Sequence, residues 1–205
     1  MVIKVCGLTR AEDVDVAVRH GATAIGFVFW PDSPRAVTAD HAASLIARIP
    51  PGVHRVGVFV NESVAAIQAV IERAGLTCVQ LHGDEPASYA AQFSQPLMRA
   101  MSVEGALSTD WPLSTTLLLD AADRARRGGT GQRVDWEGAA QVARQRPVVL
   151  AGGLTPENVE AAIEQVAPLG VDVSSGVEDA PGVKNADKVA TFLMRARRAL
   201  EAQRR

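Results

Sequence analysis

The stretch VVLAGGLTPENVEAAIEQVAPLGVDVSSG, residues 148–176, contains one complete strand–helix–strand unit. Its apolar runs, Val148–Ala151 and Val171–Ser174, are short and almost continuously hydrophobic. Such runs are typical of strands that are buried on both faces of a parallel sheet. Between them, Thr155 predicts the N-cap of a helix over Pro156–Gln165, because proline is favoured at the first helical position. The stretch therefore predicts one unit of a parallel α/β fold.

The same alternation of apolar runs and helical patterns continues along the 205-residue chain. Eight apolar runs alternate with about eight helical patterns, so each strand–helix unit has about 26 residues, which is little more than it needs. Two architectures are built from such units, the closed (β/α)8 barrel and the open doubly wound sheet. Eight units favour the barrel, and no G-x-G-x-x-G turn follows the first run as expected for a doubly wound sheet. We therefore expect one α/β domain, a (β/α)8 TIM barrel, over residues 1–205.

The remaining elements are predicted by the same rules. The other strands are expected at Val2–Cys6, Ala24–Phe29, Arg55–Val60, Cys78–Leu81, Leu97–Met101 and Thr116–Leu119. The other helices are expected at Arg10–His20, Ala39–Ile49, Val64–Ala74, Pro86–Phe93, Trp136–Arg144 and Lys184–Gln203, with at most one or two turns in Ser102–Pro112. No linker or low-complexity segment interrupts this order, so no domain boundary is expected.

Composition excludes several classes of protein. Hydrophobic residues make up 47% of the chain and the formal charge is −2, which excludes an intrinsically disordered protein. The absence of a basic excess, together with 4% aromatic residues, argues against nucleic acid as a partner. No signal-peptide pattern begins the chain and no apolar run is long enough to span a bilayer, so no membrane association is expected. Two cysteines are too few for a disulfide framework, and we expect a cytoplasmic protein.

The glycine- and serine-rich segments after the last two predicted strands are candidate binding loops. Active sites of (β/α)8 barrels lie at the carboxyl ends of the strands, and the loops after strands seven and eight commonly bind phosphate. Gly152 and Gly153 let backbone N–H groups approach a ligand, and Ser174, Ser175 and Gly176 add hydroxyl and N–H groups. Either segment alone fits an ordinary turn. Together, at these two strand ends, they predict a phosphate site.

Cys6 and Asp120 end the first and sixth predicted strands. Strands seven and eight separate these two strands around a barrel, so their ends face each other across part of its mouth. A thiol and a carboxyl group in these places could act as base and acid on opposite sides of a bound sugar. Taken singly, Cys6 fits an inert core cysteine. Asp120 alone fits a helix cap or a salt bridge with Arg124, Arg126 or Arg127.

Other polar residues near the strand ends have weaker signals. Arg35, in a rigid Ser-Pro-Arg turn, could bind a carboxylate with two hydrogen bonds, although a single arginine is often only solvated. His82 could orient a substrate or simply bond to its own loop. The chain has no His-x-His or paired-Cys cluster, so no metal site is expected. Lys4 is the only lysine on a predicted strand, which gives weak support to Schiff-base chemistry.

Several longer motifs are spread in order over nearly the whole chain. They are KVCGLT (4–9), GFVFWPDSPR (26–35), VGVFVN (56–61), VQLHGDE (79–85), LLD (118–120), GGTG (128–131), LAGGLTPEN (150–158) and VDVSSGVE (171–178). Together they resemble the phosphoribosylanthranilate isomerases, (β/α)8 enzymes of tryptophan biosynthesis. The resemblance is specific, because Lys-x-Cys-Gly, Gln-Leu-His-Gly and Asp-Val-Ser-Ser-Gly-Val-Glu occur in this order in few other families.

The resemblance implies an isomerase that performs an Amadori rearrangement of N-(5-phosphoribosyl)anthranilate without a cofactor. It implies Cys6 as general base and Asp120 as general acid, with Arg35 binding the carboxylate of the substrate. Asp120 would have to be protonated, which partial burial favours, and Cys6 deprotonated, which oriented N–H groups could assist. The partner would be a small phosphorylated substrate, and the protein a monomer or homodimer. The remaining substrate-binding residues would be Gly7, His82, Gly152, Gly153, Asp172, Ser174, Ser175 and Gly176.

Two alternatives stay open at this point. One is a related isomerase of histidine biosynthesis, or an enzyme acting on both substrates, although the resemblance places aspartate where this chain has Cys6. The other is a barrel that binds a phosphorylated ligand without catalysis, which would need the two loops but neither Cys6 nor Asp120.

Overall fold

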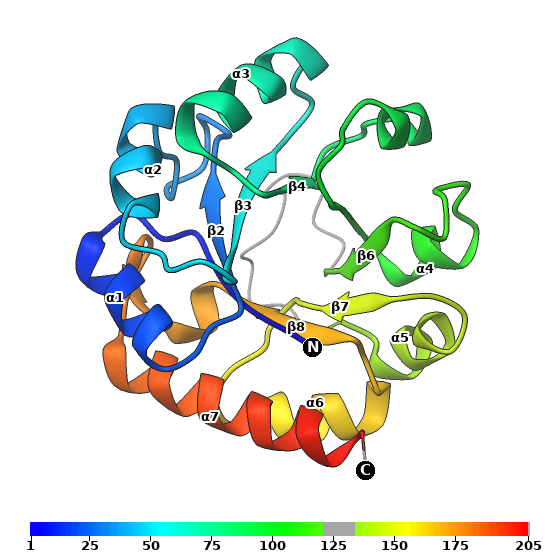
Figure 1. The fold of residues 1–205 in the computed structure, drawn as a ribbon. Helices are drawn as coiled ribbons and strands as arrows, with labels where there is room; N and C mark the ends of the chain where they lie inside the picture. Colours follow the sequence, from blue (N-terminus) through cyan, green and yellow to red (C-terminus); the bar gives the residue numbers. More distant parts are fainter. Residues whose placement is uncertain (121–133, 205) are drawn as a thin grey trace.

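The computed structural model describes residues 1–120 and 134–204. Eight parallel strands close into a barrel in sequence order, with β1 paired to both β2 and β8 (Figure 1). The strands are β1 (Val2–Cys6), β2 (Ala24–Val28), β3 (His54–Phe59), β4 (Cys78–Leu81), β5 (Leu97–Met101), β6 (Thr116–Leu119), β7 (Val148–Leu150) and β8 (Gly170–Val173). The predicted α/β class and (β/α)8 architecture are confirmed, and every predicted strand is present within about one residue of its expected ends.

Helices surround the barrel (Figure 1). They are α1 (Ala11–Arg19), α2 (Ala39–Ile46), α3 (Val64–Ala74), α4 (Val103–Leu107), α5 (Trp136–Ala143), α6 (Val159–Val166) and α7 (Ala186–Ala202). The segment predicted as a helix over Pro86–Phe93 is instead the short 3₁₀ helix η1 (Ala87–Ala91). Among the described residues, no helix combines the length and the apolar character that a bilayer crossing requires.

The predicted start of the helix after β7 was wrong. The Thr155 hydroxyl accepts a hydrogen bond from the Glu157 N–H, as the predicted cap would, but α6 begins only at Val159, and Asn158 occupies the N-cap position. The Asn158 side chain accepts a hydrogen bond from the Thr155 N–H and donates one to the Gly153 carbonyl. These bonds tie the preceding turn to the glycine loop, so residues expected in the first helical turn shape that loop instead.

The last helix also begins later than predicted. Val183–Lys184 forms a strand, β10, that pairs in antiparallel fashion with β9 (Glu178–Ala180). Asn185 then caps α7, because its side chain accepts a hydrogen bond from the Lys188 N–H. The small hairpin β9–β10 follows the 3₁₀ helix η2 (Ser175–Val177) and was not predicted.

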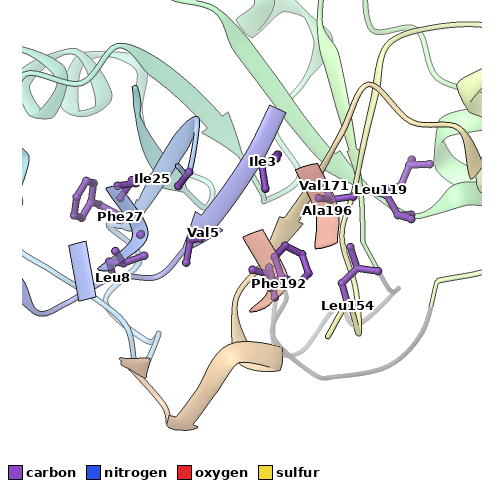
Figure 2. Close-up of a cluster of buried hydrophobic side chains, with 14 of the residues drawn as sticks. Ile3, Val5, Leu8, Ile25, Phe27, Leu119, Leu154, Val171, Phe192 and Ala196 are labelled. Atoms are coloured by element: carbon purple, nitrogen blue, oxygen red, sulfur yellow. The ribbon is translucent and has the colours of Figure 1, made fainter. Parts of the chain in front are cut away.

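The side chains of β1 alternate between the apolar layer under the helices and the interior of the barrel. Ile3 and Val5 belong to the large apolar cluster between strands and helices, and Figure 2 shows them near Val171 of β8 and Phe192 of α7. Successive side chains of a strand point to opposite faces. Lys4 and Cys6 therefore point into the barrel, where both are buried.

Candidate active site

The loops that follow β7 and β8 approach each other closely. Gly152 and Gly153 have φ values of 69° and 66°, in the left-handed region that favours glycine. A Cβ atom on Gly176 would lie 1.9 Å from the Leu154 carbonyl oxygen, so only glycine permits this approach. Within the described residues, the N–H groups of Gly152 and Gly153 donate to no other protein atom. These donors are available for an anion, as the phosphate site predicted from the sequence would require.

Most of the predicted site residues line one pocket at the carboxyl ends of the strands. The pocket brings the carboxylates of Asp120 and Asp172 together with both loops. Those of its lining residues that the sequence singled out are Asp120, Gly152, Gly153, Asp172, Ser174, Ser175 and Gly176. A ligand in this pocket would therefore meet anion-binding loops and a carboxyl group at the same time.

Cys6, Gly7, Arg35 and His82 do not line this pocket but are linked to residues that do. The Ser174 hydroxyl donates to the Cys6 carbonyl oxygen at 3.1 Å. A Cβ atom on Gly7 would lie 2.5 Å from Arg35 Cδ and 3.2 Å from Ser174 Oγ. The ends of β1 and β8 and the loop after β2 thus meet at one place.

A buried ion pair lies inside the barrel beside Cys6. Lys4 Nζ donates to both carboxylate oxygens of Asp172 at 3.0 Å, and the Lys4 side chain is fully buried. Burial alone would lower the pKa of Lys4, but Asp172 and Cys6 together outweigh burial and raise it. Lys4 therefore stays protonated, which makes it a poor nucleophile and removes the support for Schiff-base chemistry.

The thiol of Cys6 has an environment different from the expected one. Burial holds the pKa of this thiol above its ordinary value, and the positive charges of Lys4 and Lys184 offset that effect only in part. Oriented N–H groups were expected to assist the thiolate. In the structure, the ammonium groups of Lys4 and Lys184 are the groups that favour the thiolate, whereas the sequence suggested Lys4 only for Schiff-base chemistry.

Arg35 is held by a carboxylate that the sequence analysis missed. Its Nε and Nη2 atoms donate to the two oxygens of Glu178 at 2.8 and 2.6 Å. Glu178 also accepts from Lys184 Nζ at 2.8 Å, and Lys184 donates in turn to the Ser174 carbonyl. The bidentate edge of Arg35, expected to bind a ligand, is thus occupied by the protein. Arg35 Nη1 donates to no acceptor among the described residues and is available for a ligand.

The role of Glu178 as the partner of Arg35 becomes visible only in the folded hairpin. Burial raises the pKa of this carboxyl group, but Arg35 and Lys184 outweigh burial and hold it below its ordinary value. The residue lies at the end of the VDVSSGVE motif, which was the one signal in the sequence. The pairing itself depends on β9–β10 folding back beside the loop after β2.

His82 lies between Gln80 and Asp120 at the ends of β4 and β6. The Gln80 amide is 3.1 Å from His82 Nδ1, and His82 Nε2 is 3.6 Å from Asp120 Oδ2. If the amide donates to Nδ1, a neutral imidazole has its proton on Nε2, which faces the carboxylate. The alternative partners Arg124, Arg126 and Arg127 of Asp120, and the motif 128–131, lie outside the described residues.

The described residues hold no group of three histidine, cysteine, aspartate or glutamate side chains that could bind a metal ion. The chemical groups that the site does offer are a thiol, a carboxyl group beside an imidazole, an arginine with a free amino group and two loops with free N–H donors. Together they suit acid–base chemistry on a small phosphorylated and carboxylated molecule.

Comparisons with known proteins point to one family of isomerases. The family model described as N-(5′-phosphoribosyl)anthranilate isomerase matches residues 3–195. The chain is 46% identical to N-(5′-phosphoribosyl)anthranilate isomerase of Syntrophus aciditrophicus over 200 residues, which cover 96% of this chain and 87% of that protein. It is 46% identical to the enzyme of the same name from Trichlorobacter lovleyi, with 97% and 98% of the two chains covered.

Solved structures are similar as well. Phosphoribosylanthranilate isomerase of Thermotoga maritima has a TM-score of 0.86 and 38% identity, and the match covers 96% of this chain and 99% of that one. A phosphoribosylanthranilate isomerase in complex with reduced 1-(o-carboxyphenylamino)-1-deoxyribulose 5-phosphate has a TM-score of 0.84 and 38% identity, with the same coverage.

Proposed function

Because the chain belongs to the N-(5′-phosphoribosyl)anthranilate isomerase family, we propose that it catalyses the Amadori rearrangement of N-(5-phosphoribosyl)anthranilate to 1-(2-carboxyphenylamino)-1-deoxyribulose 5-phosphate. It is an isomerase of tryptophan biosynthesis, and the reaction is proposed to proceed by acid–base catalysis without a cofactor. The observation that supports this most directly is the pocket in which Asp120 meets the loops after β7 and β8.

The substrate is proposed to lie across the mouth of the barrel. Its phosphate would accept hydrogen bonds from the N–H groups of Gly152 and Gly153 and from the segment Ser174–Gly176. Its carboxylate would bind Arg35 through Nη1, while Glu178 holds the guanidinium in place. A solved relative binds a reduced compound that has both a carboxyphenyl and a phosphate group, which supports this arrangement.

Asp120 is proposed to start the reaction as general acid. It donates a proton to the ring oxygen of the ribose, the bond from that oxygen to C1′ breaks, and the nitrogen lone pair forms the C1′=N bond of a Schiff base. His82, facing the Asp120 carboxyl group, would help to hold it towards the sugar. Protonated carboxyl groups are favoured by partial burial, and the Asp120 side chain is 13% exposed.

Cys6 is proposed to complete the reaction as general base. Its thiolate removes the proton from C2′, and the electron pair of that bond forms C1′=C2′ while the nitrogen becomes neutral. The resulting enol-amine loses the proton of its C2′ hydroxyl and gains one at C1′, which gives the ketone. The change is an internal shift of protons and electrons, so neither an oxidant nor a reductant is required. General acid and base groups each contribute about 10²–10⁴ in rate.

Two further expectations belong to this proposal. Residues 1–205 are proposed to work as one domain, and the protein is proposed to act in the cytoplasm. Cys6 and Cys78 are free thiols, which suits a reducing compartment. The monomeric or homodimeric state stays a prediction.

The purified protein tests the proposal directly. It is expected to convert N-(5-phosphoribosyl)anthranilate and to restore growth of a tryptophan auxotroph that is blocked at this step. Turnover only of the aminoaldose substrate of histidine biosynthesis would contradict the proposal. Binding of phosphate without turnover of either substrate would indicate a binding protein.

Replacing Arg35 with alanine is expected to raise KM by about ten- to a hundredfold and to leave kcat nearly unchanged, because a charged hydrogen bond is worth about 1.5–3 kcal/mol in binding. Glu178 keeps Lys184 as a partner in this variant, so the fold is expected to persist. Steady-state kinetics give the two constants. Arg48→Ala removes an exposed salt bridge with Asp15 and serves as the matched control. An unchanged KM in Arg35→Ala would remove Arg35 from the carboxylate site.

Replacing Gly176 with alanine is expected to weaken binding of inorganic phosphate by about tenfold or more, since small displacements of positioning groups have large effects. The new methyl group would collide with the Leu154 carbonyl and push the two loops apart. The free energy of unfolding should fall by about 1–3 kcal/mol. Calorimetric titration and thermal unfolding measure the two effects. The control is Gly105→Ala, where the nearest atom would be 3.5 Å away, and equal phosphate binding in both variants would contradict the prediction.

A further inference from the structure

Lys4 is a fully buried lysine that takes no part in the proton transfers proposed above. Its side chain has no exposed surface, and its ammonium group donates to both carboxylate oxygens of Asp172 inside the barrel. Removing a charge from water costs several kcal/mol, and replacing a buried ion pair by apolar residues is often neutral or stabilising. Stability alone therefore gives little reason for a Lys4–Asp172 pair at this place.

The barrel places Lys4 beside the proposed base. Lys4 and Cys6 are two residues apart on β1, so their side chains share the inner face of the strand. Both side chains pack over Gly26 of β2, where a Cβ atom would lie 2.7 Å from Cys6 Sγ and 3.1 Å from Lys4 Nζ. A side chain at this position would separate the thiol from the ammonium group. Glycine leaves the two groups next to each other.

Asp172 sets the position and the charge of Lys4. The pairing of β1 with β8 places Lys4 opposite Asp172, and both carboxylate oxygens accept from Nζ at 3.0 Å. The ammonium group is thus fixed at a point near the thiol and keeps its proton. The other charged groups that act on Cys6 are Lys184 of β10 and Arg35 of the loop after β2, and both are held by Glu178.

We propose that Lys4, held in place by Asp172, is a positioning residue that stabilises the thiolate of Cys6 through a fixed positive charge. The inference rests on the proposed role of Cys6 as base. The thiol proton leaves to solvent before the substrate binds, and Lys4 neither accepts nor donates a proton in the reaction. Desolvation of the site by bound substrate would strengthen the attraction between ammonium and thiolate.

The test is a titration of Cys6 by the ultraviolet absorbance of its thiolate, measured without substrate and with the matching Cys6→Ser variant as blank. Lys4→Met is expected to move the midpoint of the Cys6 titration to higher pH by about one unit or more, because an opposite charge at close range favours the ionised form. Asp172→Asn is expected to move the midpoint less than Lys4→Met does, because the Asp172 carboxylate opposes ionisation of the thiol but also holds the ammonium group beside it. A purely structural role of the pair would leave the midpoint unchanged in both variants.

A double variant covers the case in which Lys4→Met fails to fold. Lys4→Met with Asp172→Asn leaves no unpaired charge in the barrel. The effect of Lys4 on the thiol is larger than that of Asp172, so the double variant should still hold less thiolate than the wild type. The acidic limb of kcat/KM should move to higher pH along with the titration. A folded double variant with wild-type or greater thiolate content would overturn the proposal.

The titration also separates this inference from the proposed function. It reports on the thiol whether or not the protein turns over a substrate. Full activity of Cys6→Ser would contradict the role of Cys6 as base, while a shifted titration in the Lys4 variants would still establish the electrostatic contact.

Discussion

Replacing Cys6 with serine is expected to lower kcat by about 10²–10⁴-fold, the range in which a general base contributes. Serine is close to cysteine in size and keeps the hydrogen bond that the Cys6 carbonyl accepts from Ser174. Its hydroxyl group, however, is far too weak an acid to provide an anionic base near neutral pH. Single-turnover kinetics should show the loss in the chemical step, while circular dichroism and the unfolding temperature stay close to those of the wild type.

Cys78 offers a matched control for this experiment. It is the second of the two free thiols, is buried on β4, and burial raises its pKa to about 11. Cys78→Ser therefore tests loss of a buried thiol that has no role in the reaction, and kcat should stay within about twofold of wild type. If both variants keep nearly normal kcat, Cys6 is not the base.

Replacing Asp120 with asparagine is expected to lower kcat by a similar factor, about 10²–10⁴. Asparagine occupies the same space beside His82 but cannot protonate the ring oxygen, so the furanose ring should stay closed. Because the loops after β7 and β8 are untouched, binding of the phosphate group should persist. Steady-state kinetics and calorimetric binding of a product analogue separate the two effects.

Asp187→Asn is a suitable control, since Asp187 is an exposed aspartate in the first turn of α7. Its kcat should equal that of the wild type. Weak binding of the product analogue together with low kcat in Asp120→Asn would point to a binding role for Asp120. Unchanged kcat would exclude it as the acid.

The strands and the glycine turn after β7 could be predicted because their signals are local. Apolar runs such as Val2–Cys6 and Cys78–Leu81 have the length and composition of buried parallel strands, and the structure keeps both within the same bounds. Gly152 and Gly153 mark a turn that needs positive φ, as observed. The position of Asp120 at the mouth follows directly from the order of the strands.

Contacts between distant charged residues could not be predicted. Arg35 and Glu178 are 143 residues apart, and Lys4 and Asp172 are 168 apart. The sequence does not show which arginine pairs with which carboxylate. Helices and strands have a regular spacing of apolar residues, whereas ion pairs between distant residues leave no such pattern. The late start of α7 has the same origin, since Lys184 turns inward to Glu178 instead of beginning the helix.

By itself, the sequence determined the architecture, the family and the end of the barrel at which the candidate site lies. These depend on hydrophobic periodicity, strand order and motif residues, all of which can be read along the chain. Only the tertiary structure decided the electrostatic state of the site, namely that Lys4 stays charged beside Cys6 and that Glu178 holds Arg35. The physical reason is that closure of β1 against β8 buries Lys4 beside Asp172, and the β9–β10 hairpin places Glu178 beside Arg35. The free energy of a buried charge depends on the partners that the fold places around it.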